Sequence, residues 1–324
     1  MTYSRISGTG SHLPGKVVTN KDLEKIMDTD DQWIRERTGI RERRVVIEGE
    51  TTTTLAEEAC RKAIAAADID PAEIDLLLMG TTTPDLVFPS SACLIQKNLG
   101  LPDCGAMDVN AACSGFVYAL SIADKFIRCG DAKKVLVCGS ETLTSMVNWE
   151  KRDTAVLFGD GAGAVVLEAC EEPGILSTHI HANGNHADLL NTEVGVSRGF
   201  AGIEANGGKP ELKMKGNEVF KVAVRTLGRI VDETLEANNM DKSEIDWLIP
   251  HQANLRIIVA TARKLEMSID QVVITVDRHG NTSAASVPLA LDEAIRDGRF
   301  KLVYMLLLEA FGGGFTWGSA LIKY

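Results

Sequence analysis

The stretch DVNAACSGFVYAL, residues 108–120, decides the fold, because an apolar strand runs through small residues into the start of an amphipathic helix. A second stretch, NTSAASVPLALDEAIRDG, residues 281–298, also has small residues followed by an amphipathic helical pattern. Each helix is predicted to end at a glycine, Gly130 or Gly298, because glycine readily adopts the left-handed backbone that closes a helix. The two stretches therefore predict an internal repeat, the feature that most constrains a fold assignment.

Two further pairs of segments favour a duplication. Residues 72–75 followed by LLLMG resemble residues 243–246 followed by WLIPH, at a spacing of 171 that sets His251 opposite Gly80. Matching the helix ends at Ile127 and Ile295 gives a spacing of 168, which sets Asn281 opposite Cys113. The run FGDGAGAVVL from Phe158 resembles the run FGGGFTWGSAL from Phe311, at a spacing of 153 residues. Strands and helices alternate in each part, so we predict two pseudo-equivalent α/β halves, residues 1–173 and 174–324.

Composition excludes several classes of protein. The 324 residues are 45% hydrophobic, enough for a large core, and no run of eighteen apolar residues or secretion signal is present. We therefore expect a cytoplasmic protein without a membrane partner. The seven cysteines form no C-x-x-C pair, so reduced thiols are expected and no metal site is predicted. A formal net charge of −11 argues against a general nucleic-acid binder.

The helix starts carry the chemistry. Cys113 follows a predicted strand at the opening of a helix, where backbone N–H groups are expected to lower the pKa of its thiol. A buried structural cysteine is the competing interpretation. His251, in IPHQANLRI, and Asn281, in DRHGNTSAAS, also lie at strand or helix ends. A core histidine and a helix cap are their alternatives; only the combination of thiol, imidazole and amide favours an active site at the seam between the halves.

Two glycine-rich runs have different interpretations. AFGGGFTWG, residues 310–318, suits a turn whose backbone approaches a ligand, so the N–H groups of Cys113 and Gly314 are predicted to form an oxyanion hole. A plain turn between strands is the alternative. GDGAGA, from Gly159, enters a predicted strand instead of a helix, which argues against a nicotinamide-binding loop.

Four motifs, DVNAACSGF, PHQANLRI, DRHGNTSAASVPLAL and AFGGGFTWGSAL, closely resemble β-ketoacyl-acyl carrier protein synthase III, in the right order and along the whole chain. The resemblance implies a thiolase-like five-layered αβαβα fold, a homodimer and no cofactor. It also implies that an acyl group, typically acetyl, passes from acyl-CoA to malonyl-acyl carrier protein with loss of CoA and CO2. Cys113 would carry the acyl group, while His251 and Asn281 would stabilise the enolate formed by decarboxylation.

The resemblance also implies three sets of binding residues. Those for CoA are Thr29, Trp33, Arg37, Arg152, Gly216, Asn217, Phe220, Ala253 and Asn254. Those for the acyl pocket are Leu143, Phe158, Met214 and Phe311, together with Phe88, which would reach into the pocket of the partner subunit. Those for the acidic acyl carrier protein are Lys221, Arg256, Arg263 and Lys264. Solvated surface charge is the alternative for the basic residues.

Rival functions remain at this point. A relative that condenses other acyl groups for secondary metabolism would share every motif, because chain preference rests on small differences in the pocket. A degradative thiolase needs a second cysteine as base, which the C-terminal GGGF run does not offer. A silent partner subunit would typically lack the nucleophile. The histidines at 179, 181 and 186 hint at a metal but fall in a region rich in Gly and Asn, which predicts a surface loop.

Overall fold

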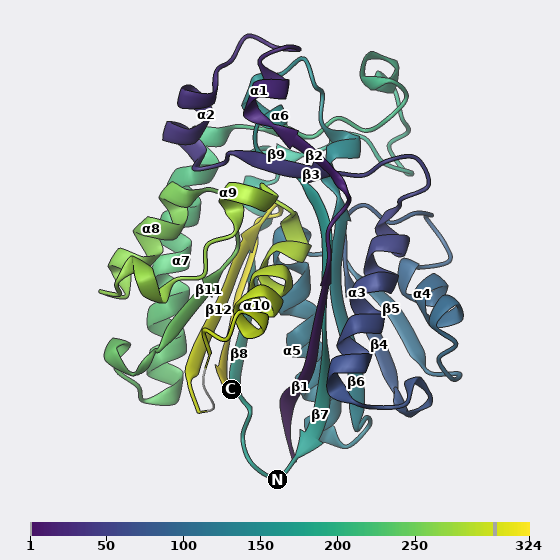
Figure 1. The fold of residues 1–324 in the computed structure, drawn as a ribbon, viewed down its shortest axis with the longest axis vertical. Coiled ribbons are helices and arrows are strands. Elements are labelled where there is room, and N and C mark those ends of the chain that lie inside the picture. The colour runs from purple at the N-terminus through teal and green to yellow at the C-terminus, as the bar shows by residue number, and fades with distance from the viewer. Residues whose placement is uncertain (1, 301–302) are drawn as a thin grey trace.

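The computed structural model describes residues 2–300 and 303–324 and contains two mixed β-sheets (Figure 1). The first sheet has the order β1 (Tyr3–His12), β7 (Asp160–Cys170), β6 (Lys134–Thr142), β4 (Leu76–Gly80), β5 (Gly105–Val109). The second has the order β11 (Trp247–Pro250), β12 (Met305–Gly312), β13 (Thr316–Lys323), β8 (Ile175–Ala182). In the first sheet β4 pairs in parallel with β6, and the pairs β6–β7 and β7–β1 are antiparallel. In the second sheet β11 pairs in parallel with β12, and the pairs β12–β13 and β13–β8 are antiparallel.

Helices complete the layers of the fold. Helices α5 (Gly115–Cys129) and α10 (Ser286–Arg296) lie between the two sheets, and their apolar side chains join both sheets in one buried cluster. Helices α3 (Thr52–Ala67) and α4 (Ser91–Leu99) cover the outer face of the first sheet. Helices α7 (Gly216–Asn238) and α8 (Leu255–Lys264) cover the second. The predicted five-layered αβαβα fold is confirmed.

Short elements gather around one end of the two sheets (Figure 1). They include two small hairpin-like pairs, β2 (Lys16–Thr19) with β3 (Glu42–Val45) and β9 (Leu190–Asn191) with β10 (Lys213–Met214). The short helices are α1 (Asn20–Leu23), α2 (Asp31–Thr38), α6 (Arg152–Ala155) and α9 (Val276–His279). Among the 3₁₀ turns, η2 (Ala112–Ser114) and η8 (Ser283–Ala285) lead into the two central helices. These connections enclose the predicted site.

Matching local details appear in both halves. A capping box formed by Asp70 and Glu73 precedes β4, and one formed by Asp241 and Glu244 precedes β11. The first strand of each half, β1 or β8, has a bulge in its register. The turns η2 and η8 each contain a residue with positive φ, 46° at Ala112 and 51° at Ser283. Such shared irregularities indicate a duplicated unit more strongly than shared helices and strands do.

The register that we predicted between the halves is wrong at two places. The starts of α5 and α10, Gly115 and Ser286, are 171 positions apart, so Cys113 corresponds to Ala284 and Asn281 corresponds to Asn110. Matching the helix ends misled us because α10 is shorter than α5. The match of Phe158 with Phe311 is also wrong, since Phe158 precedes β7 whereas Phe311 lies within β12.

Across residues 2–300 and 303–324, none of the helices has the length and apolar character needed to cross a bilayer. The predicted cytoplasmic location itself stays a prediction.

Candidate active site

Cys113 lies in the tight turn η2, directly before α5, and only 8% of its surface is exposed. The end of β12 packs against it so closely that a Cβ on Gly312 would lie 2.5 Å from the Cys113 nitrogen. Hydrogen bonding from the backbone at Cys113 itself and at Gly313 lowers the pKa of the thiol. Gly313 and Gly314 both line a cavity together with Cys113, and the oxyanion hole that we predicted from Cys113 and Gly314 stays a prediction.

The environment of the Cys113 thiol differs from our prediction. Burial raises its pKa to about 11, against the lowering effect of hydrogen bonds from Ser283 and the backbone. The negative charge of Glu141 raises it further. The expected low pKa is therefore wrong, because the loss of hydration of a buried thiolate exceeds the favourable effect of the nearby N–H groups. Cys113 rests as a neutral thiol.

His251 follows β11 and is held from three directions. Its N–H donates to the Glu309 carbonyl on β12 at 2.8 Å. Its neighbour Gln252 is buried, donates to two carbonyls and accepts from two backbone N–H groups, which fixes the loop. The His251 Nδ1 lies 2.6 Å from the Ser286 hydroxyl, so Nε2 is the nitrogen left for a substrate. Burial lowers the pKa of His251 to about 3, so the imidazole is neutral at physiological pH.

Asn281 has a fixed amide orientation. Its Oδ1 accepts the Ser283 N–H at 2.9 Å, which leaves the Nδ2 group to donate elsewhere. Its backbone is bonded on both sides to the segment before β7, with N–H to Leu157 O at 2.8 Å and O from Gly159 N–H at 3.0 Å. The side chain is buried and lines the same cavity as Cys113 and His251. The three predicted residues are thus brought together from three separate segments.

Two cavities meet at Cys113. The first, about 250 Å³, contains Cys113, His251 and Asn281 at one end and is lined toward the surface by Trp33 and Arg37. The second, about 630 Å³, continues past Cys113 and is lined by Leu143 and other residues of the short elements, together with Ser283. The arrangement offers a thiol nucleophile, two neutral hydrogen-bond donors and two routes of approach.

Comparison with known proteins identifies the family. Two profiles match, "3-Oxoacyl-[acyl-carrier-protein (ACP)] synthase III" over residues 107–184 and its C-terminal counterpart over residues 235–324. Among curated proteins, "Beta-ketoacyl-[acyl-carrier-protein] synthase III" of Xylella fastidiosa strain 9a5c is 66% identical over 322 residues, covering 99% of this chain and 98% of its own. The protein of the same name from Thioalkalivibrio sulfidiphilus is 62% identical over the whole of both chains. The chain belongs to the synthase III family.

Solved structures agree with this assignment. The crystal structure of 3-oxoacyl-[acyl-carrier-protein] synthase III from Aquifex aeolicus matches with a TM-score of 0.92 and 47% identity, over 99% of this chain and 100% of that chain. The priming β-ketosynthase of the R1128 polyketide pathway matches with a TM-score of 0.94 and 35% identity, over 99% and 96% of the two chains. The synthase III fold thus serves more than one pathway, and identity is higher to the synthase III proteins named above.

Most of the predicted CoA-binding residues of this synthase III chain lie along the first cavity: Trp33, Arg37, Gly216, Asn217, Phe220, Ala253 and Asn254. Thr29 and Arg152 do not line it. Arg152 lies 4.7 Å from the centre of the Trp33 ring and Arg37 lies 4.9 Å from it, so two guanidinium groups pack on the indole. The buried Thr29 hydroxyl has no hydrogen-bond partner in the described residues and is available to a ligand.

The predicted acyl pocket is only partly assembled within this chain. Phe158 lines both cavities, Leu143 lines the second, and Met214 and Phe311 line the first. Phe88 lines neither and is 84% exposed, in an exposed apolar run with Leu86 and Val87. Its predicted role requires a partner subunit, so it stays a prediction.

The basic residues predicted to bind acyl carrier protein lie on α7 and α8. Arg256 lines the first cavity near its entrance and packs over the Phe220 ring at 5.2 Å. Lys221 and Arg263 are exposed, whereas Lys264 forms an ion pair with Asp232 at 2.7 Å, which reduces its availability. Two exposed arginines on α7, Arg225 and Arg229, follow Lys221 at helical spacing and were missed by the sequence analysis.

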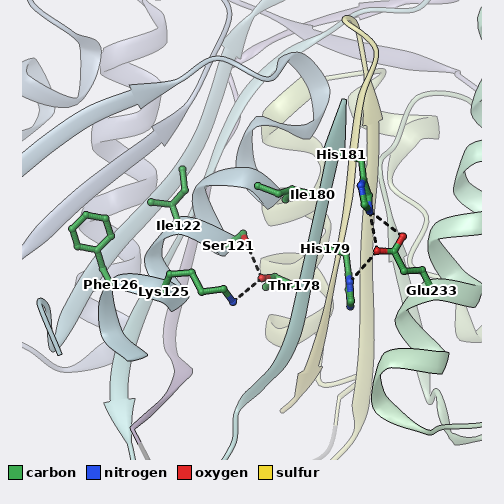
Figure 2. A pocket seen from close by; sticks show the side chains of 9 residues that line it. All are labelled: Ser121, Ile122, Lys125, Phe126, Thr178, His179, Ile180, His181 and Glu233. Carbon is green, nitrogen blue, oxygen red and sulfur yellow. Dashed lines mark hydrogen bonds and ion pairs between the residues drawn. The ribbon is translucent and has the colours of Figure 1, made fainter. Parts of the chain in front are cut away.

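The histidine cluster is not the surface loop that we predicted. His179 and His181 lie in strand β8, and both imidazoles point toward Glu233 of α7 at 3.2 Å and 2.9 Å (Figure 2). Only His186 lies in a connection, the turn η4 (Gly184–His186). Within residues 2–300 and 303–324 there is no group of three His, Cys, Asp or Glu side chains suited to a metal ion. Strand alternation, not ligation, explains why two of the three face the same way.

Several supporting residues were also missed. Ser286 orients His251, Ser283 orients Asn281, and Glu141 lies behind Ser283. The two serines stand within the SAAS part of a motif that we quoted, so their nearness to Asn281 was a usable signal. Glu141 had no such signal, because its neighbours come from distant segments.

Proposed function

We propose that this chain joins a short acyl group from acyl-CoA, with acetyl as the first candidate, to malonyl-acyl carrier protein and thereby starts fatty acid synthesis. The products are 3-ketoacyl-acyl carrier protein, CoA and CO2. The observation that carries the proposal is the meeting of one thiol with two neutral, oriented hydrogen-bond donors in one buried cavity. Full-length similarity to proteins named synthase III supports it.

In the first half-reaction the Cys113 sulfur attacks the thioester carbonyl of acyl-CoA. The developing oxyanion is stabilised by the N–H of Cys113 and by one from the adjoining Gly313–Gly314 turn, which lines the same cavity as Cys113. The C–S bond to CoA then breaks and the acyl group stays on Cys113. The narrow packing of Gly312 against Cys113 holds the donors and the nucleophile in one geometry.

In the second half-reaction the malonyl thioester replaces CoA and loses CO2. The thioester oxygen becomes an enolate, which accepts hydrogen bonds from His251 Nε2 and Asn281 Nδ2. For Nε2 to donate, Nδ1 must accept from the Ser286 hydroxyl, and the 2.6 Å contact fits this arrangement. A neutral imidazole suits this role, because the pKa of His251 is lowered to about 3. Donors of this kind in comparable sites contribute about 10²–10³-fold in rate.

We also propose a homodimer and a docking face for acyl carrier protein. The run Leu86–Phe88 is exposed and apolar, and β5 lies at the free edge of its sheet, so both features favour burial against a second copy. Lys221, Arg256 and Arg263 offer positive charge beside the cavity entrance on a chain of net charge −11. Light scattering on wild type and Phe88→Asp tests the dimer; a wild-type monomer would contradict it.

The central test compares wild type with Cys113→Ala and Asn281→Ala using radiolabelled acyl-CoA and malonyl-acyl carrier protein. Wild type should acquire label and release CO2, Cys113→Ala should not acquire label, and Asn281→Ala should acquire label but condense slowly. Acetyl-, butyryl- and branched acyl-CoA are compared in parallel, because a preference for longer primers would favour a role in another pathway. Wild type that takes no label from any of them would contradict the proposed function.

A further inference from the structure

Glu141 is a fully buried carboxyl at the end of β6, close to the seam between the halves. Five donors converge on its two oxygens: the hydroxyls of Thr81, Thr82, Thr83 and Ser283, and the N–H of Thr82. No basic side chain accompanies it in this set. A buried acid held by neutral donors, beside a nucleophile, is a candidate for proton exchange as well as for structure.

Ser283 connects this carboxyl to the nucleophile. Its hydroxyl donates to Glu141 Oε1 at 3.0 Å, and its side chain lines the same cavity as Cys113. Hydrogen bonding between the Ser283 and Cys113 side chains lowers the pKa of the Cys113 thiol. The backbone of Ser283 is held with φ of 51° and its N–H donates to Asn281, so the position of the hydroxyl is fixed. Because the only hydroxyl proton points at Glu141, lone pairs are left for the thiol proton.

Relief of the repulsion between the two charges lowers the cost of a proton transfer from Cys113 to Glu141. Burial raises the pKa of both Cys113 and Glu141, and the charge on Glu141 adds to the cost of forming the thiolate. Moving the thiol proton to Glu141 removes that repulsion and keeps one negative charge in the buried site. His251, which lines the first cavity with Cys113, is kept neutral by burial. The charged residues Arg37, Asp153 and Arg256 line the same cavity.

We propose that Glu141 accepts the Cys113 proton through the Ser283 hydroxyl when acyl-CoA is bound, a step that rests on the proposed function. Cys113 gives its proton to Ser283 Oγ while Ser283 gives its own to Glu141. The thiolate forms a bond to the thioester carbon and the bond from that carbon to the CoA sulfur breaks. The proton then returns by the same path to the CoA thiolate, so the enzyme ends neutral at Cys113 and charged at Glu141.

The test separates acylation from decarboxylation. Single-turnover acylation by radiolabelled acetyl-CoA is measured for wild type, Ser283→Ala, Glu141→Gln and a matched control, Thr81→Val. The control removes one hydroxyl donor from the same carboxyl, at 3.3 Å, but lies off the path to Cys113. Malonyl decarboxylation is measured for each substitution in a Cys113→Ala background, where acylation cannot contribute.

We expect Ser283→Ala and Glu141→Gln to slow acylation by about 10²-fold or more, the usual contribution of a positioned proton acceptor. Thr81→Val should stay close to wild type, and decarboxylation should change little, because Ser283→Ala keeps the N–H that orients Asn281. If Thr81→Val slows acylation equally, or if acylation and decarboxylation fall together, Glu141 only supports the structure and the proposal is wrong.

The pH dependence of the acylation rate should change in the variants if Glu141 exchanges protons with Cys113, but not if Glu141 only supports the structure. Acylation by wild type should be nearly flat from pH 7 to 9, because the proton stays within the site. In Glu141→Gln and Ser283→Ala the rate should rise steadily with pH, since the thiolate then forms only by exchange with solvent. Faster acylation in Glu141→Gln than in wild type would overturn the proposal; absence of acylation in wild type would instead overturn the proposed function.

Discussion

The Ser286 hydroxyl is predicted to set the tautomer of His251. It lies 2.6 Å from Nδ1, is buried, and also accepts the Gln252 N–H at 3.3 Å. Ser286→Ala removes the partner of Nδ1 and so weakens the preference for a proton on Nε2, the nitrogen that faces the cavity. Leaving one buried polar group without its partner costs about 1–3 kcal/mol. If that energy is lost from the enolate transition state, condensation falls by about 5- to 150-fold.

The assay measures the two half-reactions separately. Acylation of Cys113 by acetyl-CoA should keep its wild-type rate, whereas decarboxylation and condensation should fall together, with kcat affected more than KM. Ser4→Ala is the matched control, because Ser4 is equally buried and donates one hydrogen bond, to Asp124 at 2.7 Å, far from the site. Both variants should lose similar stability. Equal condensation by Ser286→Ala and Ser4→Ala would refute the assignment of a tautomer-setting role to Ser286.

Three other predictions concern packing, pH and binding. Gly312→Ala should abolish acylation and lower the melting temperature, because the new Cβ would lie 2.5 Å from the Cys113 nitrogen; wild-type acylation would show that the turn can shift. Burial raises the pKa of Glu309 to about 8, and neither carboxyl oxygen has a hydrogen bond of normal geometry, although Thr261 lies near. The folded protein therefore keeps the proton on Glu309, and its free energy of unfolding falls as pH rises from about 4.5 to 8, by about 3 kcal/mol at pH 7. Glu309→Gln should flatten this pH dependence of unfolding. Trp33→Ala should raise KM for acyl-CoA with little change in kcat at saturation, and an unchanged KM would remove Trp33 from the binding site.

The sequence contained enough information to predict the layers and the three reactive side chains. Cys113, His251 and Asn281 each lie where an apolar run meets a helix or turn, and such points come together when strands share a sheet edge. The register between the halves was mispredicted because helix ends look alike while α10 is shorter than α5. The pKa of Cys113 could not be predicted from its place before a helix, since burial by β12 and the charge of Glu141 are tertiary effects. Long-range partners such as Ser283 and Glu141, 142 positions apart, leave no periodic signal.

The corrected register explains why a duplicated fold has a single active site. Glu141 is the penultimate residue of β6 and Gly312 the last residue of the equivalent strand β12, at the same 171-residue spacing as the helix starts. The end of each strand approaches the turn of the opposite half: Gly139 of β6 lies against Ala284 in η8, and Gly312 lies against Cys113 in η2.

Two replacements break this symmetry. A side chain at Gly312 would collide with the Cys113 backbone, so the nucleophile has room only for glycine there, while the matching site accommodates the carboxyl of Glu141. A Cβ at Gly80 would lie 2.4 Å from the Gly115 carbonyl carbon, so the first half has no space for a counterpart of His251. The duplication thus supplies paired positions, and steric limits at Gly80 and Gly312 restrict the imidazole of His251 and the carboxyl of Glu141 to one copy each.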